Sequence, residues 1–171
     1  MKANRDPSFV GLEVLKQKHT DTLTDFRRWA AAKDWASFHR SHYDWWMFPI
    51  DGPSGFGFAY TVFEKEIEEL REDGRYLEGL LEGAALLARS WGWDLEKAAP
   101  ISDPDPDQRW QNWPIRLYKA TKCMKLFESD EAYRPLRQYG RGLLAQGISF
   151  EYGRDLMAIS MIGLREVPCS A

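Results

Sequence analysis

The chain has 171 residues, of which 44% are hydrophobic and 29% are charged, so it is long enough to bury a core within one domain over residues 1–171. Its formal net charge of -3 argues against a general nucleic-acid binder, because such proteins normally carry a basic excess. The two cysteines form no metal or disulfide pattern, and no stretch approaches the roughly 18 apolar residues of a membrane span. We therefore expect a soluble, cytoplasmic protein without a membrane segment.

The first part of the chain is predicted to contain two helices. Residues 1–8 are polar and are expected to fray. The hydrophobic residues over 9–18 favour a short helix. A cluster of Thr and Asp follows, and Thr22 predicts the start of a second helix from Leu23 to Lys33.

A third helix is predicted between Asp34, which can cap it, and Met47, shortly before Pro49. With an advance of about 100° per residue, its aromatic side chains and two histidines share one side. The opposite side carries Ser37, Arg40, Ser41 and Asp44. We therefore expect the histidines to face the core or a pocket, and Asp44 to point away from both.

The middle of the chain predicts two further helices. Thr61 and Glu64 indicate a capping box, and the helix that follows has an acidic outer face made of Glu64, Glu66, Glu68 and Glu69. The clearest core helix extends from Leu77 to Trp91, because its apolar residues repeat at intervals of three and four. Gly92 is suited to end it.

A long proline-rich connection is predicted over about 93–113, and three helical segments follow it. Pro114 suits the first turn of a helix that extends to Phe127, and a second helix covers Tyr133 to Ala145. The last residues favour an extended segment at 148–152 and a helix from Leu156 to Leu164. We therefore predict an all-α, single-domain helical bundle of six to eight helices.

His39 and His42 are the first candidates for a functional site. They lie three residues apart on a predicted helix, which is a spacing that metal ligands use. A third ligand is not evident, since Asp44 is expected on the other side. The sequence favours hydrogen-bonded histidines in an aromatic core or pocket wall, and we expect no metal and no cofactor. The alternative is a small enzyme that uses His39 or His42 as an acid, a base or a metal ligand.

Arg116 is the second candidate, because it falls at the start of the apolar face of its helix. A buried charge without a partner costs several kcal/mol, roughly, so the guanidinium must be paired. One interpretation is an internal ion pair or a cap on neighbouring carbonyl groups. The other is an anion site, in which Arg116 and the helix N-terminus bind a carboxylate or phosphate.

The order of motifs over about 34–144 resembles the conserved region of the opioid growth factor receptor and its bacterial relatives. The matching residues are Tyr43, Trp46, Phe48 and Pro49, then Ser54 and Thr61, Trp91-Gly92, Gln111-Asn112-Trp113 and the segment from Thr121 to Phe127. A histidine of that family falls at Ser41, so His39 and His42 are not its equivalents. The resemblance implies an all-helical fold, and the receptor members are associated with peptide binding and growth regulation.

Our leading functional hypothesis is a non-enzymatic binding module with an aromatic- and arginine-lined pocket. The aromatic content and Arg116, without a catalytic arrangement, suggest a small anionic or peptide ligand. The predicted ligand-binding residues are Tyr43, Trp46, Asn112, Trp113 and Arg116. A further alternative is a helical subunit of a larger assembly, which would use the acidic face over 64–69 or exposed tryptophans. The sequence does not indicate the oligomeric state.

Overall fold

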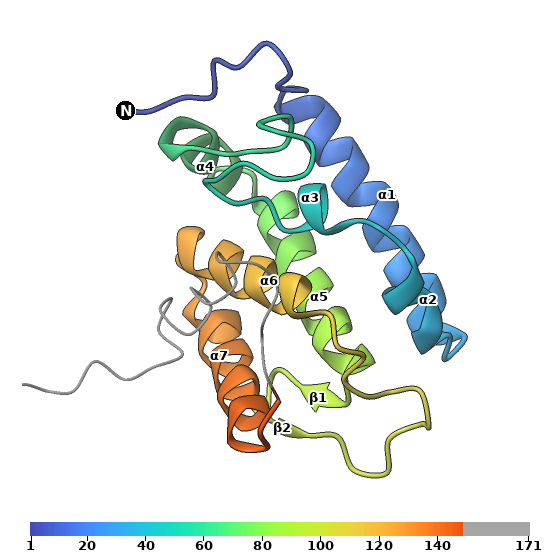
Figure 1. The fold of residues 1–171 in the computed structure, drawn as a ribbon. Coiled ribbons are helices and arrows are strands. Elements are labelled where there is room, and N and C mark those ends of the chain that lie inside the picture. The colour runs from blue at the N-terminus through green and yellow to red at the C-terminus, as the bar shows by residue number, and fades with distance from the viewer. Residues whose placement is uncertain (149–171) are drawn as a thin grey trace, which may run out of the picture.

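The computed structural model describes residues 1–148, and these form seven α-helices and one two-stranded antiparallel sheet (Figure 1). This confirms the all-α class, while the arrangement as a bundle stays a prediction. The helices are α1 (Leu12–Ala31), α2 (Trp35–Arg40), α3 (Asp44–Met47), α4 (Glu64–Arg71), α5 (Gly74–Ser90), α6 (Pro114–Leu126) and α7 (Asp130–Ala145). The strands are β1 (Trp93–Asp94) and β2 (Ala99–Pro100).

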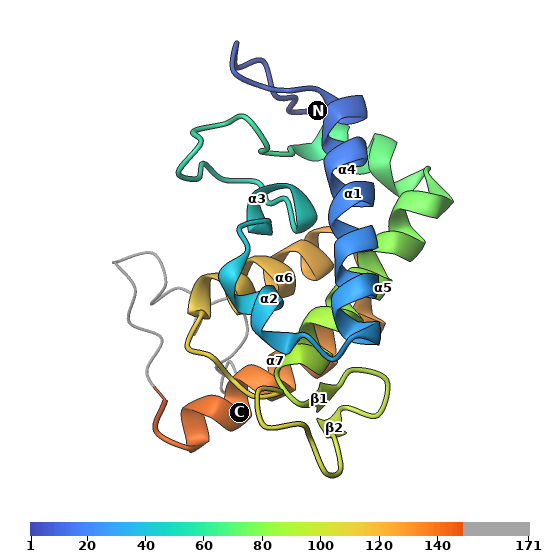
Figure 2. The ribbon, with the colours of Figure 1, turned by 90° about the vertical axis from the view of Figure 1, so that its right-hand side faces the viewer.

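The elements pack in two pairs of long helices with short helices against them. α1 packs along α5, and α6 packs against α7 (Figure 1). α3 lies between α1 and α6 and contacts both. Figure 2 shows α3 and the loop after it on the side of the molecule away from α5. No helix within residues 1–148 is long and apolar enough to cross a membrane.

The prediction of two helices before Lys33 is wrong, because α1 continues without interruption through the Thr and Asp cluster. The hydroxyl groups of Thr20 and Thr24 donate to the carbonyl oxygens of Lys16 and Thr20, each at 3.0 Å. These threonines therefore satisfy their hydroxyl groups one turn back along the helix, rather than beginning a new one.

The single helix predicted from Asp34 to Met47 is also wrong. Asp34 does cap α2, since its side chain accepts a hydrogen bond from the Ser37 backbone N–H. The helix then ends at Ser41, whose backbone is extended, and α3 begins three residues later. Two short helices, separated by the extended Ser41 and the residues after it, replace the single predicted helix.

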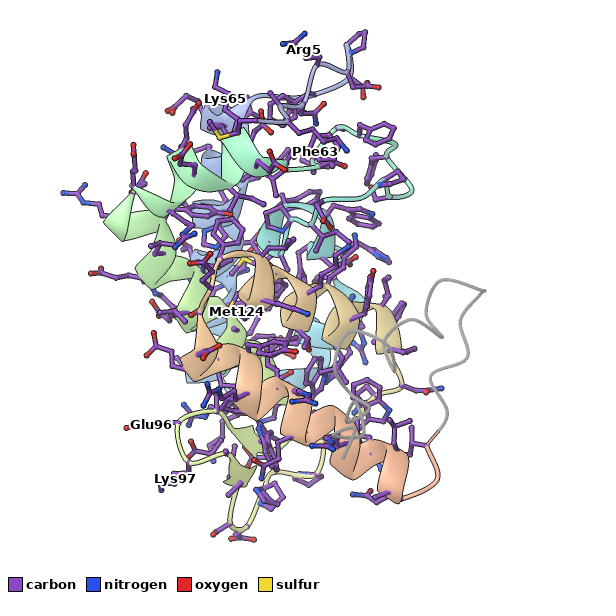
Figure 3. The ribbon with its side chains drawn as sticks, turned by 90° about the vertical axis from the view of Figure 1, so that its left-hand side faces the viewer. Arg5, Phe63, Lys65, Glu96, Lys97 and Met124 are labelled. Atoms are coloured by element: carbon purple, nitrogen blue, oxygen red, sulfur yellow. The ribbon has the colours of Figure 1, made fainter. Side chains whose placement is uncertain are left out.

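At α4 the predicted cap is replaced by a neighbouring one. Glu66, rather than Glu64, accepts the backbone N–H of Phe63 at 3.0 Å. Glu66 also accepts the N–H of Asn4, so it is buried instead of lying on the acidic outer face. The side chain of Asn4 donates to the carbonyl groups of Phe58 and Thr61, which ties the N-terminal segment to the entrance of α4. Figure 3 shows Phe63 and Lys65 there, far from Glu96 and Lys97 at the β1–β2 turn.

The helices predicted around Leu77–Trp91, Pro114–Phe127 and Tyr133–Ala145 are confirmed as α5, α6 and α7 within a few residues. Gly92 follows α5 with a φ of 77°, as expected of a residue that ends a helix. The proline-rich connection contains the β1–β2 hairpin, which the sequence did not indicate. The predictions for 149–152 and for Leu156 to Leu164 lie outside the described residues.

Candidate functional site

Arg116 is fully buried in the first turn of α6 and reaches across to α2. Its Nη1 group donates to the carbonyl oxygen of Phe38, and its Nη2 group donates to that of Ser41. Nη1 also lies 3.2 Å from the hydroxyl oxygen of Tyr43, which itself donates to the Phe38 carbonyl at 2.6 Å. The guanidinium carbon sits 4.6 Å from the centre of the Tyr43 ring and 4.7 Å from that of Trp113.

This arrangement explains why the predicted long helix breaks after Arg40. The last carbonyl groups of a helix lack partners within it and carry a partial negative charge. Arg116 supplies a cation and several N–H donors at that point, and Tyr43 supplies a hydroxyl. Arg116 therefore fits the carbonyl-capping interpretation, and an anion-binding role for it stays a prediction.

Asp44, which was predicted to lie on the polar face, is buried instead. Because α3 starts afresh after the break, the Asp44 carboxylate points towards α6 and lies 3.2 Å from the ammonium group of Lys119. Burial lowers the pKa of Lys119, and the charge of Asp44 opposes that shift. The pair joins α3 to α6 in the protein interior.

The two histidines occupy different environments and do not face each other as a pair. His39 is only 7% exposed, whereas His42 is exposed and its ring centre lies 6.2 Å from Trp45 and 6.4 Å from Trp113. Burial, and then the charge of Arg116, lower the pKa of His39 to about 4, so its ring is neutral at pH 7. No group of three or more potential metal ligands occurs among the described residues.

One side of α2 borders an open hollow of about 290 Å³, which we call the α2 hollow. Its lining comes from α2 and from the segment before α6, and consists of Ala36, His39, Arg40, Asp107, Gln111 and Trp113. Both ring nitrogens of His39 are enclosed by the protein, and a contact with the Ser90 backbone favours the charged ring and so opposes the lowering of its pKa. Arg40 is exposed and forms no ion pair within residues 1–148. The α2 hollow thus combines an aromatic face, both signs of charge and a buried imidazole.

The structure brings some of the predicted ligand-binding residues together and separates others. Tyr43, Trp113 and Arg116 are in contact, but Tyr43 and Arg116 are buried behind Trp113. Trp46 lies against α1, where its indole N–H donates to the Thr22 hydroxyl at 2.9 Å. Asn112 is exposed and has a φ of 60°, a backbone conformation that asparagine tolerates well. Of the five predicted residues, only Trp113 lines the α2 hollow.

Sequence reasoning missed Arg40, Asp107 and Gln111 as members of a shared site. Arg40 was placed on the solvent side of a helix, which is correct but gave no reason to connect it with residues almost seventy positions away. The DPDPD sequence at 103–107 signals a stiff extended segment, and such a segment can bring polar side chains alongside another helix. That signal does not identify the helix it meets.

Comparison of the chain with protein-family models, with curated proteins and with solved structures gives no match. The resemblance to the conserved region of the opioid growth factor receptor therefore stays a prediction.

Proposed function

We propose that the protein is a non-enzymatic binding module and that its ligand occupies the α2 hollow. The observation that supports this most is the lining of the hollow, which brings the exposed guanidinium of Arg40, the carboxylate of Asp107 and the indole of Trp113 together. Ligand sites typically combine an apolar or aromatic wall with a few polar groups that orient the ligand.

The charges of the α2 hollow indicate the kind of ligand. The exposed guanidinium of Arg40 suits a carboxylate, which it can bind through two parallel hydrogen bonds. Asp107 carries the opposite charge on the same lining, and Gln111 offers both donors and an acceptor. A small anion that also carries donor groups, such as a short acidic peptide, matches this set better than a simple inorganic anion does.

The face of Trp113 gives the hollow an apolar wall as well. Arg116 contacts this indole from the buried side, and its carbonyl partners on α2 fix the distance between Trp113 and that helix. In this proposal Arg116 shapes the site without touching the ligand. Arg40 and Trp113 make the contacts.

The proposal is tested by titrating the protein with a panel of small dicarboxylates and short acidic peptides. Calorimetry and tryptophan fluorescence measure the binding. We expect at least one member of the panel to bind. Arg40→Gln or Trp113→Leu should lower the affinity for that ligand about tenfold or more. Arg28→Gln removes another exposed guanidinium, from α1, and should leave the affinity unchanged. The proposal fails if no member of the panel binds, or if Arg40→Gln and Arg28→Gln behave alike.

A further inference from the structure

Five aromatic side chains form a continuous row that stays at least partly exposed, which we call the aromatic ridge. Its members, in order along the row, are Trp113, His42, Trp45, Phe56 and Tyr60. The distances between successive ring centres are 6.4, 6.2, 4.9 and 5.7 Å. Phe56 is 51% exposed, His42 is exposed, and the other three are partly buried. The ridge therefore runs from the α2 hollow, across α3, to the loop before α4.

The protein holds the outer end of the aromatic ridge in a fixed shape. Ser54 and Gly57 exchange two backbone hydrogen bonds of 2.9 Å, and Gly57 has a φ of 58°, so the chain makes a tight turn with Phe56 at its tip. The Thr61 hydroxyl donates to the Gly52 carbonyl at 2.9 Å and closes the base of this loop. Exposing the large apolar ring of Phe56 to water is unfavourable, and a bound partner that covered the ring would remove this free-energy cost.

Three members of the aromatic ridge carry hydrogen-bond donors that have no acceptor among the described residues. The indole N–H groups of Trp35 and Trp46 are both bonded, to Asp105 and to Thr22. By contrast, the indole N–H groups of Trp45 and Trp113 and the hydroxyl of Tyr60 bond to no described residue and are not enclosed. A partner on the ridge must therefore present acceptors together with flat apolar surface.

Charge limits the partner further, because within residues 1–148 the solvent-accessible cations placed beside the ridge without an ion pair lie at its two ends. The Lys18 ammonium group sits 4.4 Å from the Trp46 ring and 5.8 Å from the Tyr60 ring, and it forms no ion pair within residues 1–148. Arg40 lies at the Trp113 end. Between them, Lys119 and Lys122 are paired with Asp44 and Asp51 at 3.2 and 2.5 Å. The middle of the ridge is thus electrically neutral.

An extended proline-rich polypeptide fits this pattern of rings, donors and charges. A polyproline II helix advances about 3.1 Å per residue, so residues two apart are about 6 Å apart, close to the spacing of the rings. Its carbonyl groups have no internal partners and can accept hydrogen bonds from indole and tyrosine donors, while its pyrrolidine rings pack on aromatic faces. Single-stranded nucleic acid also stacks on aromatic rings, but it brings a charge with every nucleotide, which a neutral middle in a chain of net charge -3 does not match.

We propose that the aromatic ridge binds a proline-rich segment of another protein, with an acidic residue at each end of the segment facing Lys18 and Arg40. This surface is distinct from the α2 hollow, although both include Trp113. The hollow takes a compact ligand beside α2, whereas the ridge takes an extended chain across α3 and the loop over 51–61. Variants at Phe56 and Tyr60 separate the two, since neither residue lines the hollow.

The test uses a synthetic peptide that has a run of prolines with one glutamate at each end and carries a fluorescent label. We expect saturable binding by fluorescence anisotropy, a weakening of about tenfold by Phe56→Ser, and a smaller loss by Tyr60→Phe, which removes only the hydroxyl donor. Leu144→Ser removes an exposed apolar side chain from α7 and should leave the affinity unchanged. Circular dichroism and thermal unfolding verify that each variant remains folded.

Three probes of other chemistry decide between partners. The same peptide with glycine in place of proline, an oligothymidylate and a cello-oligosaccharide should each bind at least tenfold more weakly than the proline peptide. The proposal is overturned if the proline peptide does not bind, if the glycine peptide binds equally well, or if the oligothymidylate or the saccharide binds more tightly. It is also overturned if Phe56→Ser has no more effect than Leu144→Ser.

Discussion

Arg116 carries a charge into the protein interior, and within residues 1–148 it meets carbonyl and hydroxyl oxygens but no carboxylate. Its contacts with Phe38 and Ser41 neutralise the end of α2, where the helix dipole is negative. The same contacts set the turn that leads to Tyr43 and α3. Burial raises the pKa of the Tyr43 phenol, which therefore stays protonated and able to donate to the Phe38 carbonyl.

Replacing Arg116 with methionine should destabilise the protein, because the Ser41 carbonyl loses its guanidinium donor and the Phe38 carbonyl keeps only the Tyr43 hydroxyl. We expect a loss of about 2–4 kcal/mol in the free energy of unfolding, measured by urea denaturation. Arg40→Met is the matched control, since that side chain is exposed and should change the stability by no more than about 0.5 kcal/mol. Equal stability of the two variants would show that the carbonyl cap contributes nothing.

His19, which is buried where α1 packs on α5, makes the free energy of unfolding depend on pH. Its ring lies 4.8 Å from that of Tyr76, and burial lowers its pKa to about 4. The folded-state pKa lies below the value of about 6.5 for an unfolded histidine, so the folded protein prefers the neutral ring. The stabilisation that the neutral His19 ring contributes is therefore fully present above about pH 6.5 and is lost as the pH falls towards 4.

We predict that the free energy of unfolding falls between about pH 6.5 and pH 4, with His19 and His39 each contributing on the order of 3 kcal/mol at most. His19→Leu should flatten this dependence even if it changes the stability at pH 7. The measurement is a series of urea unfolding curves across the pH range. An unchanged slope in the His19→Leu variant would contradict the prediction.

At the scale of elements, the Asp44–Lys119 pair decides how α3 sits on α6. Both charges are almost fully enclosed, so removing one partner leaves the other buried and unpaired. We expect Asp44→Asn and Lys119→Met each to cost about 3–5 kcal/mol. The double variant should cost clearly less than the sum, because it leaves no uncompensated charge.

A double-mutant cycle by urea denaturation measures this coupling. The Lys122–Asp51 pair serves as the comparison within the same region, because both of its side chains are more exposed. Its coupling should stay within about 1 kcal/mol. Strictly additive effects of Asp44→Asn and Lys119→Met would mean that the pair does not join the two helices.

Prediction from sequence succeeded for elements with a regular pattern and a clear end. α5 repeats its apolar residues at intervals of three and four, and α6 begins with proline, so both could be located from the sequence. The break between α2 and α3 could not, because the residue that caps the end of α2, Arg116, lies about seventy-five positions away. Local propensity across Ser41 and His42 gives no sign of such a contact.

The same reason limited the prediction of the site. Trp113 was among the predicted ligand-binding residues because it belongs to the Gln111-Asn112-Trp113 motif of the resemblance, and the α2 hollow does include it. Arg40 and Asp107 are ordinary charged residues in their own segments, and only the fold places them on one lining. The prediction for Asp44 was wrong because it assumed one continuous helix from Asp34 to Met47. In the structure this helix is interrupted, and α3 begins at Asp44 itself.

Taken as a whole, the molecule divides its aromatic residues between two roles. Trp35, Phe38, Tyr43 and Phe48 are buried around Arg116 and α1 and form part of the core. The aromatic ridge lies directly outside them and stays in contact with solvent. The buried set fixes the positions of α2, α3 and α6, and those elements present the α2 hollow and the ridge on one face.

Ligand binding in the α2 hollow is tested most directly by the indole N–H resonances in a two-dimensional ¹H–¹⁵N NMR spectrum. Trp113→Phe assigns the resonance of Trp113, which lines the hollow, and Trp35→Phe assigns that of Trp35, whose N–H donates to Asp105 at 2.8 Å. With the tightest-binding member of the acidic panel, we expect a saturable shift of the Trp113 resonance that Arg40→Gln abolishes, with little change at Trp35. An unmoved Trp113 resonance at saturating ligand, or equal shifts at Trp113 and Trp35, would contradict it.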